Sequence, residues 1–327
     1  TMAIVLLEQR GIVSGDDVGM FNPDRDITFN EAVKMLVTAM GYEKAAQLGG
    51  GYPDGYIKTA SDISLLKHVS YKSNDKLSGA QLINIFYNAL HAKIMKISGF
   101  DGNSPIYETG EETFLSGILD VGTYRGVVDA TEYTGLYSTE GASKNCVKID
   151  GIEYELTEKT RDIMNYLGYR VDVYYKENGG ERTLYAYEFK KNDIIKLNAS
   201  EIESFEDYKL TYYTEDGKKS KTINLSRDIA VIYNGEYTDL YTSDMLVPKL
   251  GSITLIANKT EGDYDVLSVD NYKNYVVSGV DKDEKKIYNR LVPDYVLDLD
   301  KDDLDYFMTD KNGLDIDISE IPVNSIM

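Results

Sequence analysis

The sequence predicts an α+β multidomain chain, in which a helical N-terminal domain precedes repeated small β-barrel modules of OB-like type. Three observations support this fold class. Apolar residues recur at helical spacing through about the first 95 residues. From Gly117 onward, short alternating runs rich in Tyr, Val, Ile and Thr are typical of β-strands. Within that second region a pattern of residues repeats at a constant offset.

Composition and charge restrict the classes of function. The 327 residues include one cysteine, Cys146, which excludes a disulfide framework and a cysteine-based metal cluster. The net charge is −20, and residues 1–100 carry ten acidic and ten basic side chains, so the whole excess lies in residues 101–327. Such a surface repels phosphate backbones and argues against nucleic-acid binding. No run of about 18 apolar residues occurs, so we expect no membrane span.

The first predicted helical module covers residues 1–42. The chain opens within a short amphipathic helix that stops at Gly11, so we interpret it as a trimmed piece of a longer precursor. Thr28 is expected to cap the next helix, and Glu31 completes a capping box. Apolar residues then follow at helical spacing until Gly41.

A second helical module is predicted over residues 50–95, which completes a helical domain over 1–96. A turn at Tyr52-Pro53-Asp54-Gly55 leads into a helix over Tyr56–Val69. The apolar face of that helix is expected to consist of Ile57, Ala60, Ile63 and Leu66. Ser78 caps a last helix, whose apolar residues are Leu82, Ile85, Phe86, Ala89 and Leu90.

The rest of the chain divides into a linker and β modules. Residues 97–116 are rich in Gly, Ser and acidic residues and are predicted to be a linker. The β modules are expected at 117–192, at 193–273 and, as a partial module, at 274–327. The element order of three strands, a short helix and two strands is that of an OB-like barrel, although other small barrels also fit.

The first two β modules repeat each other. Each has a hairpin with an Asp-Gly or Asn-Gly turn, at Asp150-Gly151 and Asn234-Gly235, followed by a short helix, a glycine and two strands. One offset of 83 residues relates several pairs: Tyr154 and Tyr237, Leu167 and Leu250, Gly168 and Gly251, Leu184 and Leu267. This regularity predicts two modules of the same architecture.

The helical region resembles a known family, the S-layer homology (SLH) domain. The resemblance rests on the short apolar helix, on Gly11-Ile-Val-Ser-Gly15, on Asp17, Gly19, Phe21 and Pro23, and on Ile27-Thr28 with Glu31. Residues 50–90, with GGYPDGY and ASDISLLKHV, are similar to the clostridial type of the module. The resemblance implies an extracellular protein at the cell wall or S-layer of a Firmicute-type bacterium. Its implied partner is the secondary cell-wall polysaccharide, or other surface proteins.

The resemblance also implies the residues of a glycan contact. In the family this contact centres on a Thr-Arg-Ala-Glu-like segment, whose arginine binds an anionic sugar substituent. The matching positions here are Thr28-Phe29-Asn30-Glu31 and Ser78-Gly79-Ala80-Gln81, and neither keeps the arginine. Thr28, Glu31 and Ser78 are therefore the candidate cell-wall glycan-binding residues, with helix capping as the structural alternative.

No catalytic residues are predicted. The two histidines, His68 and His91, lie at predicted helix ends without the spacing of a zinc site, and no Gly-x-Ser-x-Gly turn or phosphate-binding glycine loop occurs. We therefore expect neither an enzyme nor a cofactor. The tyrosines at 174, 175, 185 and 187 could form a stacking platform, but cross-strand packing is the favoured interpretation.

An acidic stretch near the C-terminus gives the one weak metal candidate. Asp298, Asp300 and Asp302 have the spacing of the first half of a calcium loop, but Asp303 stands where such a loop needs glycine and Thr309 where it needs glutamate. A solvated acidic segment is the favoured interpretation.

The sequence thus favours a non-enzymatic, wall-associated structural or interaction protein with divergent SLH modules. Two alternatives stay open. The chain could be a fragment of a carbohydrate-active or wall-remodelling enzyme whose catalytic domain lies elsewhere, or the β-barrels could carry a ligand-binding module.

Overall fold

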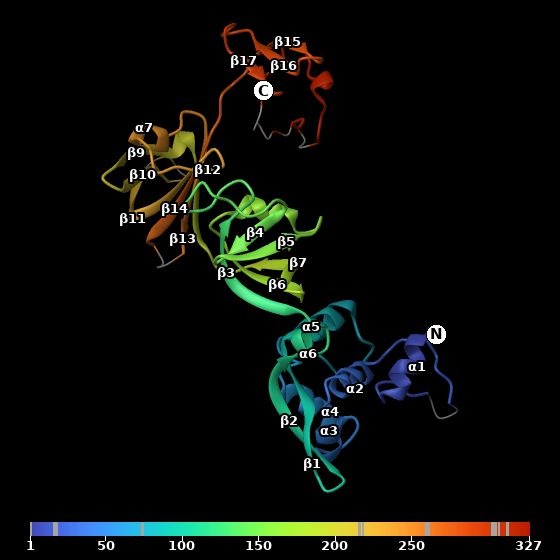
Figure 1. Cartoon of the computed structure of the whole chain (residues 1–327). Coiled ribbons are helices and arrows are strands. Elements are labelled where there is room, and N and C mark those ends of the chain that lie inside the picture. Colours follow the sequence, from blue (N-terminus) through green and yellow to red (C-terminus); the bar gives the residue numbers. More distant parts are fainter. Residues whose placement is uncertain are drawn as a thin grey trace. The chain divides into compact units, whose positions relative to one another are not determined.

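The computed structural model describes residues 2–15, 19–72, 75–214, 217, 219–258, 262–301, 306, 308–311 and 314–327 (Figure 1). The chain divides into two compact units, which are described separately. The first contains Thr1–Gly126, Asn145–Asn165 and Val171–Lys190, and the second contains the remaining segments up to Met327.

The first unit begins with five helices: α1 (Met2–Gln9), α2 (Phe29–Ala39), α3 (Glu43–Leu48), α4 (Asp54–Asp62) and α5 (Gly79–His91). Their core gathers around α2, which buries Phe29, Val33 and Val37 completely. Such side chains each contribute roughly 1.5–3 kcal/mol when fully buried. By contrast, α1 buries none of its residues.

Two of the predicted helices differ from those observed. The helix predicted over Tyr56–Val69 ends at Asp62, because Ser64 takes a left-handed φ of 65° and His68 one of 60°. Its buried face is formed by Tyr56, Thr59 and Ala60 rather than by the predicted residues, of which only Ala60 is buried. On α5 the core-facing residues are Ile85 and Ala89, while Leu82 and Phe86 are exposed.

The predicted linker at 97–116 is a β-hairpin followed by a helical turn. Strand β1 (Lys93–Asp101) pairs antiparallel with β2 (Ser104–Thr113), and α6 (Phe114–Gly117) follows. Gly102 supplies the positive φ of the turn. Most positions of both strands are exposed. Strands exposed in this way carry many polar residues, as a linker does, and the linker prediction was wrong for this reason.

Five strands form the next sheet: β3 (Gly122–Ala130), β4 (Cys146–Ile149), β5 (Ile152–Leu156), β6 (Arg170–Asn178) and β7 (Glu181–Phe189). Their order is β3-β4-β5-β7-β6, and the sheet closes on itself. Asp150 and Gly151 form the predicted β4–β5 turn, both with positive φ. The predicted short helix is a 3₁₀ helix at Arg161–Tyr166.

The second unit contains a seven-stranded sheet. Its strands are β8 (Asp193–Asn198), β9 (Ile202–Glu206), β10 (Lys209–Tyr213), β11 (Ser220–Tyr233), β12 (Glu236–Tyr237), β13 (Gly251–Ala257) and β14 (Tyr264–Asn271). The order is β8-β13-β14-β11-β10-β9, with β12 beside β11. A short helix, α7 (Ser243–Leu246), precedes β13. The two ends of this path, β8 and β9, are joined by the three residues Ala199–Glu201.

A three-stranded sheet completes the second unit: β15 (Val277–Asp281), β16 (Lys286–Asn289) and β17 (Val296–Asp298). Tyr275 is 6% exposed and holds this sheet together. Its hydroxyl lies 2.6 Å from the carbonyl oxygen of Ile287 and 2.7 Å from that of Tyr295, and it accepts a hydrogen bond from the Leu297 N–H.

The predicted order, a helical SLH-like region followed by a mostly β region with several sheets, is confirmed. The repeat is kept in its turns but not in its strand pairing. Asn234 and Gly235 turn with positive φ like their counterparts. However, β5 pairs in parallel with β7 in the first sheet, whereas the parallel partner of β14 in the second is β11 and not β12. Repeated OB-like barrels are therefore not confirmed by the pairing.

Candidate functional site

The first candidate site is the N-terminus of α2, where Thr28 and Glu31 form the predicted capping box. The Thr28 hydroxyl oxygen accepts a hydrogen bond from the Glu31 N–H at 3.3 Å. The Glu31 carboxylate in turn accepts from the Thr28 N–H at 2.8 Å and from the Thr28 hydroxyl at 2.9 Å. These contacts satisfy backbone donors that a helix start leaves without partners. Both residues thus have a structural role.

An arginine that the sequence analysis missed completes this site. The Arg25 guanidinium contacts the Glu31 carboxylate, with Nη2 at 2.7 Å from Oε1 and Nη1 at 3.4 Å from Oε2. The Arg25 side chain is 59% exposed, so its charge also faces solvent. The family pattern has its arginine at the position that Phe29 occupies here. In the structure, residues 22–25 form a turn before the helix, closed by the Arg25 N–H donating to the Asn22 carbonyl at 3.2 Å, and the Arg25 side chain contacts the Glu31 carboxylate.

Phe29 occupies the position of the family's arginine, and the structure places it in the core. The ring is fully buried and stacks on Tyr71, with 4.3 Å between centroids and 4° between planes. The residue therefore contributes to packing and presents no polar group to a ligand.

Ser78 forms the equivalent cap on α5. Its hydroxyl oxygen accepts from the Gln81 N–H at 3.3 Å, and the Gln81 side-chain oxygen accepts from the Ser78 N–H at 2.9 Å. Gln81 also donates to the Ser70 carbonyl at 2.8 Å. This second cap carries no charged group of its own.

The structure brings the two caps onto neighbouring backbone segments. Thr28 and Lys76 form an isolated antiparallel bridge. The Leu77 N–H donates to the Ile27 carbonyl at 3.0 Å, and Lys76 forms an ion pair with Asp26. All three predicted glycan-binding residues therefore lie on or next to the two paired segments, residues 27–28 and 76–77. The exposed cations Arg25 and Lys76 lie on or close to the same segments. An exposed guanidinium and ammonium on adjacent segments can bind an anionic group.

The Arg25 contact makes the stability of this site depend on pH. The hydrogen bond from Arg25 is the main cause that lowers the pKa of the Glu31 carboxyl, and Thr28 adds to it. A carboxyl with a lowered folded-state pKa stabilises the fold above its unfolded-state pKa, and that contribution is lost as pH falls through the folded-state value.

We therefore expect acid to destabilise the helical region less in Glu31→Gln than in the unchanged protein. The difference should be below about 1 kcal/mol, since the pair is partly exposed. Thermal unfolding followed by far-UV circular dichroism at pH 7 and at about pH 3 measures it. An equal loss of stability in both proteins would contradict this role for Glu31.

The acidic candidate and the histidines are not gathered into a site among the described residues. Asp298 accepts from the Asp300 N–H at 3.1 Å, and Asp300 pairs with Lys285 at 3.0 Å. Asp302 lies outside the described residues. His91 ends α5, and His68 lies in the turn after α4. Within the part of the chain that the structure describes, no group of three or more metal-ligating side chains occurs. Calcium binding therefore stays a prediction.

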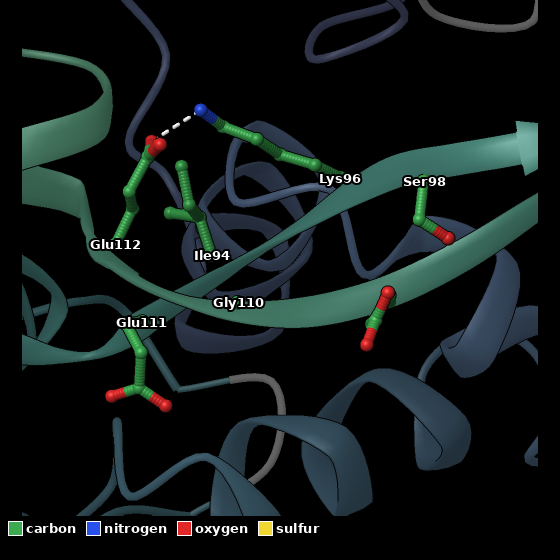
Figure 2. A pocket seen from close by; sticks show the side chains of 7 residues that line it. Ile94, Lys96, Ser98, Gly110, Glu111 and Glu112 are labelled. Carbon is green, nitrogen blue, oxygen red and sulfur yellow. Dashed lines mark hydrogen bonds and ion pairs between the residues drawn. The ribbon is translucent and has the colours of Figure 1, made fainter.

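A small cavity on the hairpin is lined largely by charges that pair with each other or with a neighbouring lysine. It measures about 150 Å³ and is lined by residues of β1 and β2. Figure 2 shows Lys96 facing Glu112, with which it forms an ion pair, while Glu111 points away from them. Glu111 is bound by Lys93 at 2.9 Å. Each lysine thus neutralises a neighbouring carboxylate, and the arrangement links the two strands.

Comparison with known proteins agrees with the resemblance. Residues 3–33 match the model of the S-layer homology domain. A Cell surface protein of Thermoanaerobacter kivui is 24% identical over 271 residues, which cover 80% of this chain and 32% of the relative. A Middle cell wall protein of Brevibacillus brevis is 31% identical over 110 residues, and a Surface layer protein of Brevibacillus choshinensis is 30% identical over the same length. No solved structure matches.

The predicted resemblance to the S-layer homology family is thereby confirmed for the N-terminal segment, and the predicted location at the cell wall agrees with the names of the relatives. The chain spans about a third of the length of the first relative and a tenth of the length of the other two. Among the described residues, no helix is both long and apolar enough to cross a membrane.

Proposed function

We propose that this chain is part of a non-enzymatic extracellular protein associated with the bacterial cell wall. The match of residues 3–33 to the S-layer homology domain carries the proposal. Two further observations support it. The capped starts of α2 and α5 follow two backbone segments that pair with each other. Three relatives are named as surface or wall proteins. Its partner at the helical region is the secondary cell-wall polysaccharide.

Arg25 is the residue that makes the polysaccharide contact in this proposal. The position used by the family is filled by the buried Phe29, so an anionic sugar group needs another cation. Arg25 is exposed, is oriented by the Glu31 carboxylate, and precedes the cap of α2, whose Thr28 is bridged to Lys76 just before the cap of α5. An arginine held in one orientation loses less conformational entropy on binding a carboxylate than a freely moving one.

The β modules act as spacers or as surfaces for other wall proteins, and we propose OB-like architecture for them. Two observations support this. The first sheet has its third and fifth strands, β5 and β7, parallel and adjacent. In the second, the path of strands begins and ends in β8 and β9, which three residues join. Both features fit a five-stranded Greek-key barrel.

Co-sedimentation with cell-wall sacculi tests the wall association. We expect the purified chain to sediment with intact sacculi of Thermoanaerobacter kivui, the source of the first relative. It should stay in the supernatant with sacculi from which the secondary polysaccharide has been removed. A chain that stays in solution with both preparations, or that sediments equally with both, would contradict the proposed polysaccharide contact.

A further inference from the structure

A larger cavity lies at the opposite end of α5 from the capped helix starts. It measures about 520 Å³ and is lined by the end of α4, the turn after it, the end of α5 and the hairpin. At a rise of 1.5 Å per residue, the α5 residues that line it, Tyr87 to His91, lie about 14–20 Å along the helix axis from Ser78. The capping residues do not line it. It is therefore distinct from the site around Arg25.

Polar side chains from two helices and one turn meet in this cavity. Asp62 ends α4, Lys67 lies in the turn, and Asn88 and His91 belong to the last turn of α5. Within the described residues, the Asp62 carboxylate and the Lys67 ammonium have neither a hydrogen bond nor an ion pair. By contrast, most charged side chains of the neighbouring β1–β2 hairpin form ion pairs with one another.

Asn88 is held in one orientation by the backbone. Its Nδ2 donates to the carbonyl oxygens of Leu65 and Lys67, both at 2.9 Å. Among the described residues, no group donates to its Oδ1. The amide is thus fixed as an acceptor at the cavity, and no rotamer freedom has to be lost when a ligand donates to it.

An aromatic surface lies beside these polar groups. Tyr87 and His91 are four residues apart on α5 and share one face of the helix. Their rings are T-shaped, with 5.0 Å between centroids, and Tyr87 is 48% exposed. An exposed ring next to unpaired hydrogen-bonding groups presents an apolar and a polar surface to the same ligand.

Local contacts order the wall of the cavity. Tyr42 is 5% exposed, and its hydroxyl donates to the Lys93 carbonyl at 3.1 Å. Ser64, a non-glycine residue with a φ of 65°, fixes the turn between α4 and Lys67. Ordering of these wall residues lowers the entropic cost of binding.

We infer that this cavity binds a saccharide of one or two rings. A sugar ring has an apolar C–H face, which suits Tyr87, and hydroxyl groups that both donate and accept, which suit Asp62, Asn88 and Lys67. The volume falls within the range of about 300–1,000 Å³ found for small-ligand sites. The inference rests on the proposed wall association only for the source of the sugar, which would be a second segment of the wall polysaccharide.

Saturation-transfer difference NMR on the full chain, with N-acetylglucosamine and glucose as probes, tests this inference. We expect saturable binding of at least one sugar with a dissociation constant of about 1 mM, which is typical of weak small ligands. Tyr87→Leu should weaken binding by up to about tenfold through the loss of the aromatic contact. The matched control Phe86→Leu changes an exposed aromatic neighbour that does not line the cavity, and should leave binding unchanged.

Asp62→Asn gives a second measurement with the shape of the side chain kept, and we expect weaker binding there too. The absence of saturable binding up to about 20 mM of either sugar, well above the expected constant, would overturn the inference. Binding that survives unchanged in both Tyr87→Leu and Asp62→Asn would also overturn it. Sedimentation with sacculi is judged separately, because free sugars can bind the cavity whether or not the chain associates with the wall.

Discussion

Phe29→Arg, which places the arginine of the S-layer homology pattern at its usual position, is expected to unfold the helical region. Phe29, the first residue of α2, is fully buried against Tyr71 and in the core of the helical region. A guanidinium there would lose its hydration without gaining a carboxylate partner. We expect a loss of more than about 4 kcal/mol in the free energy of unfolding, a size confined to changes of this kind. Far-UV circular dichroism during urea unfolding measures it.

Phe86→Arg is the matched control. Phe86 also lies on a helix of this region but is 48% exposed, so the same change should alter stability by no more than about 0.5 kcal/mol. If Phe29→Arg instead folded with unchanged stability and sedimented more strongly with sacculi, position 29 would be a binding position, and the packing role given to Phe29 would be wrong.

Gly251→Ala is expected to have the second large effect, in the seven-stranded sheet. Gly251 begins β13 with a φ of 114°, and a Cβ atom there would lie 1.8 Å from the carbonyl oxygen of Asp270 on β14. The backbone conformation and the close approach of the two strands both exclude a side chain. We expect a loss of about 3 kcal/mol or more in the free energy of unfolding, measured by urea unfolding with tyrosine fluorescence.

Gly235→Ala separates the two causes. Gly235 has a φ of 88° in the β11–β12 turn, but no atom lies within 4 Å of an added Cβ. Its cost is therefore that of the left-handed conformation alone, about 1–2 kcal/mol. An equal loss in the free energy of unfolding of Gly251→Ala and Gly235→Ala would show that the close approach of Asp270 does not exclude a side chain at position 251.

Local patterns in the sequence were sufficient for the helix starts and the hairpin turns. Thr28 with Glu31 and Ser78 with Gln81 are three residues apart, so their capping contacts follow from spacing alone. The same holds for the Asp-Gly and Asn-Gly turns, which require positive φ whatever surrounds them.

Contacts that depend on packing could not be predicted in this way. Arg25 reaches Glu31 because residues 22–25 form a turn before the helix, and no periodic pattern in the sequence predicts that turn. The sequence predicts a linker where the β1–β2 hairpin lies, because most positions of both strands are exposed and the hairpin lacks alternating hydrophobicity. The 83-residue repeat predicted the positions of the turns but not the parallel pairing of β14 with β11, because the whole sheet decides which strands pair.

The affinity of the purified chain for soluble secondary cell-wall polysaccharide from Thermoanaerobacter kivui tests the central claim most directly. The claim is that Arg25, and not position 29, makes the charged contact. Isothermal titration calorimetry should show saturable binding that Arg25→Gln weakens by about tenfold or more, the expected effect of losing a hydrogen bond to a charged group. Arg10→Gln, which changes an exposed arginine after α1, should leave the affinity unchanged. Equal affinity of the Arg25→Gln and unchanged proteins would contradict the account.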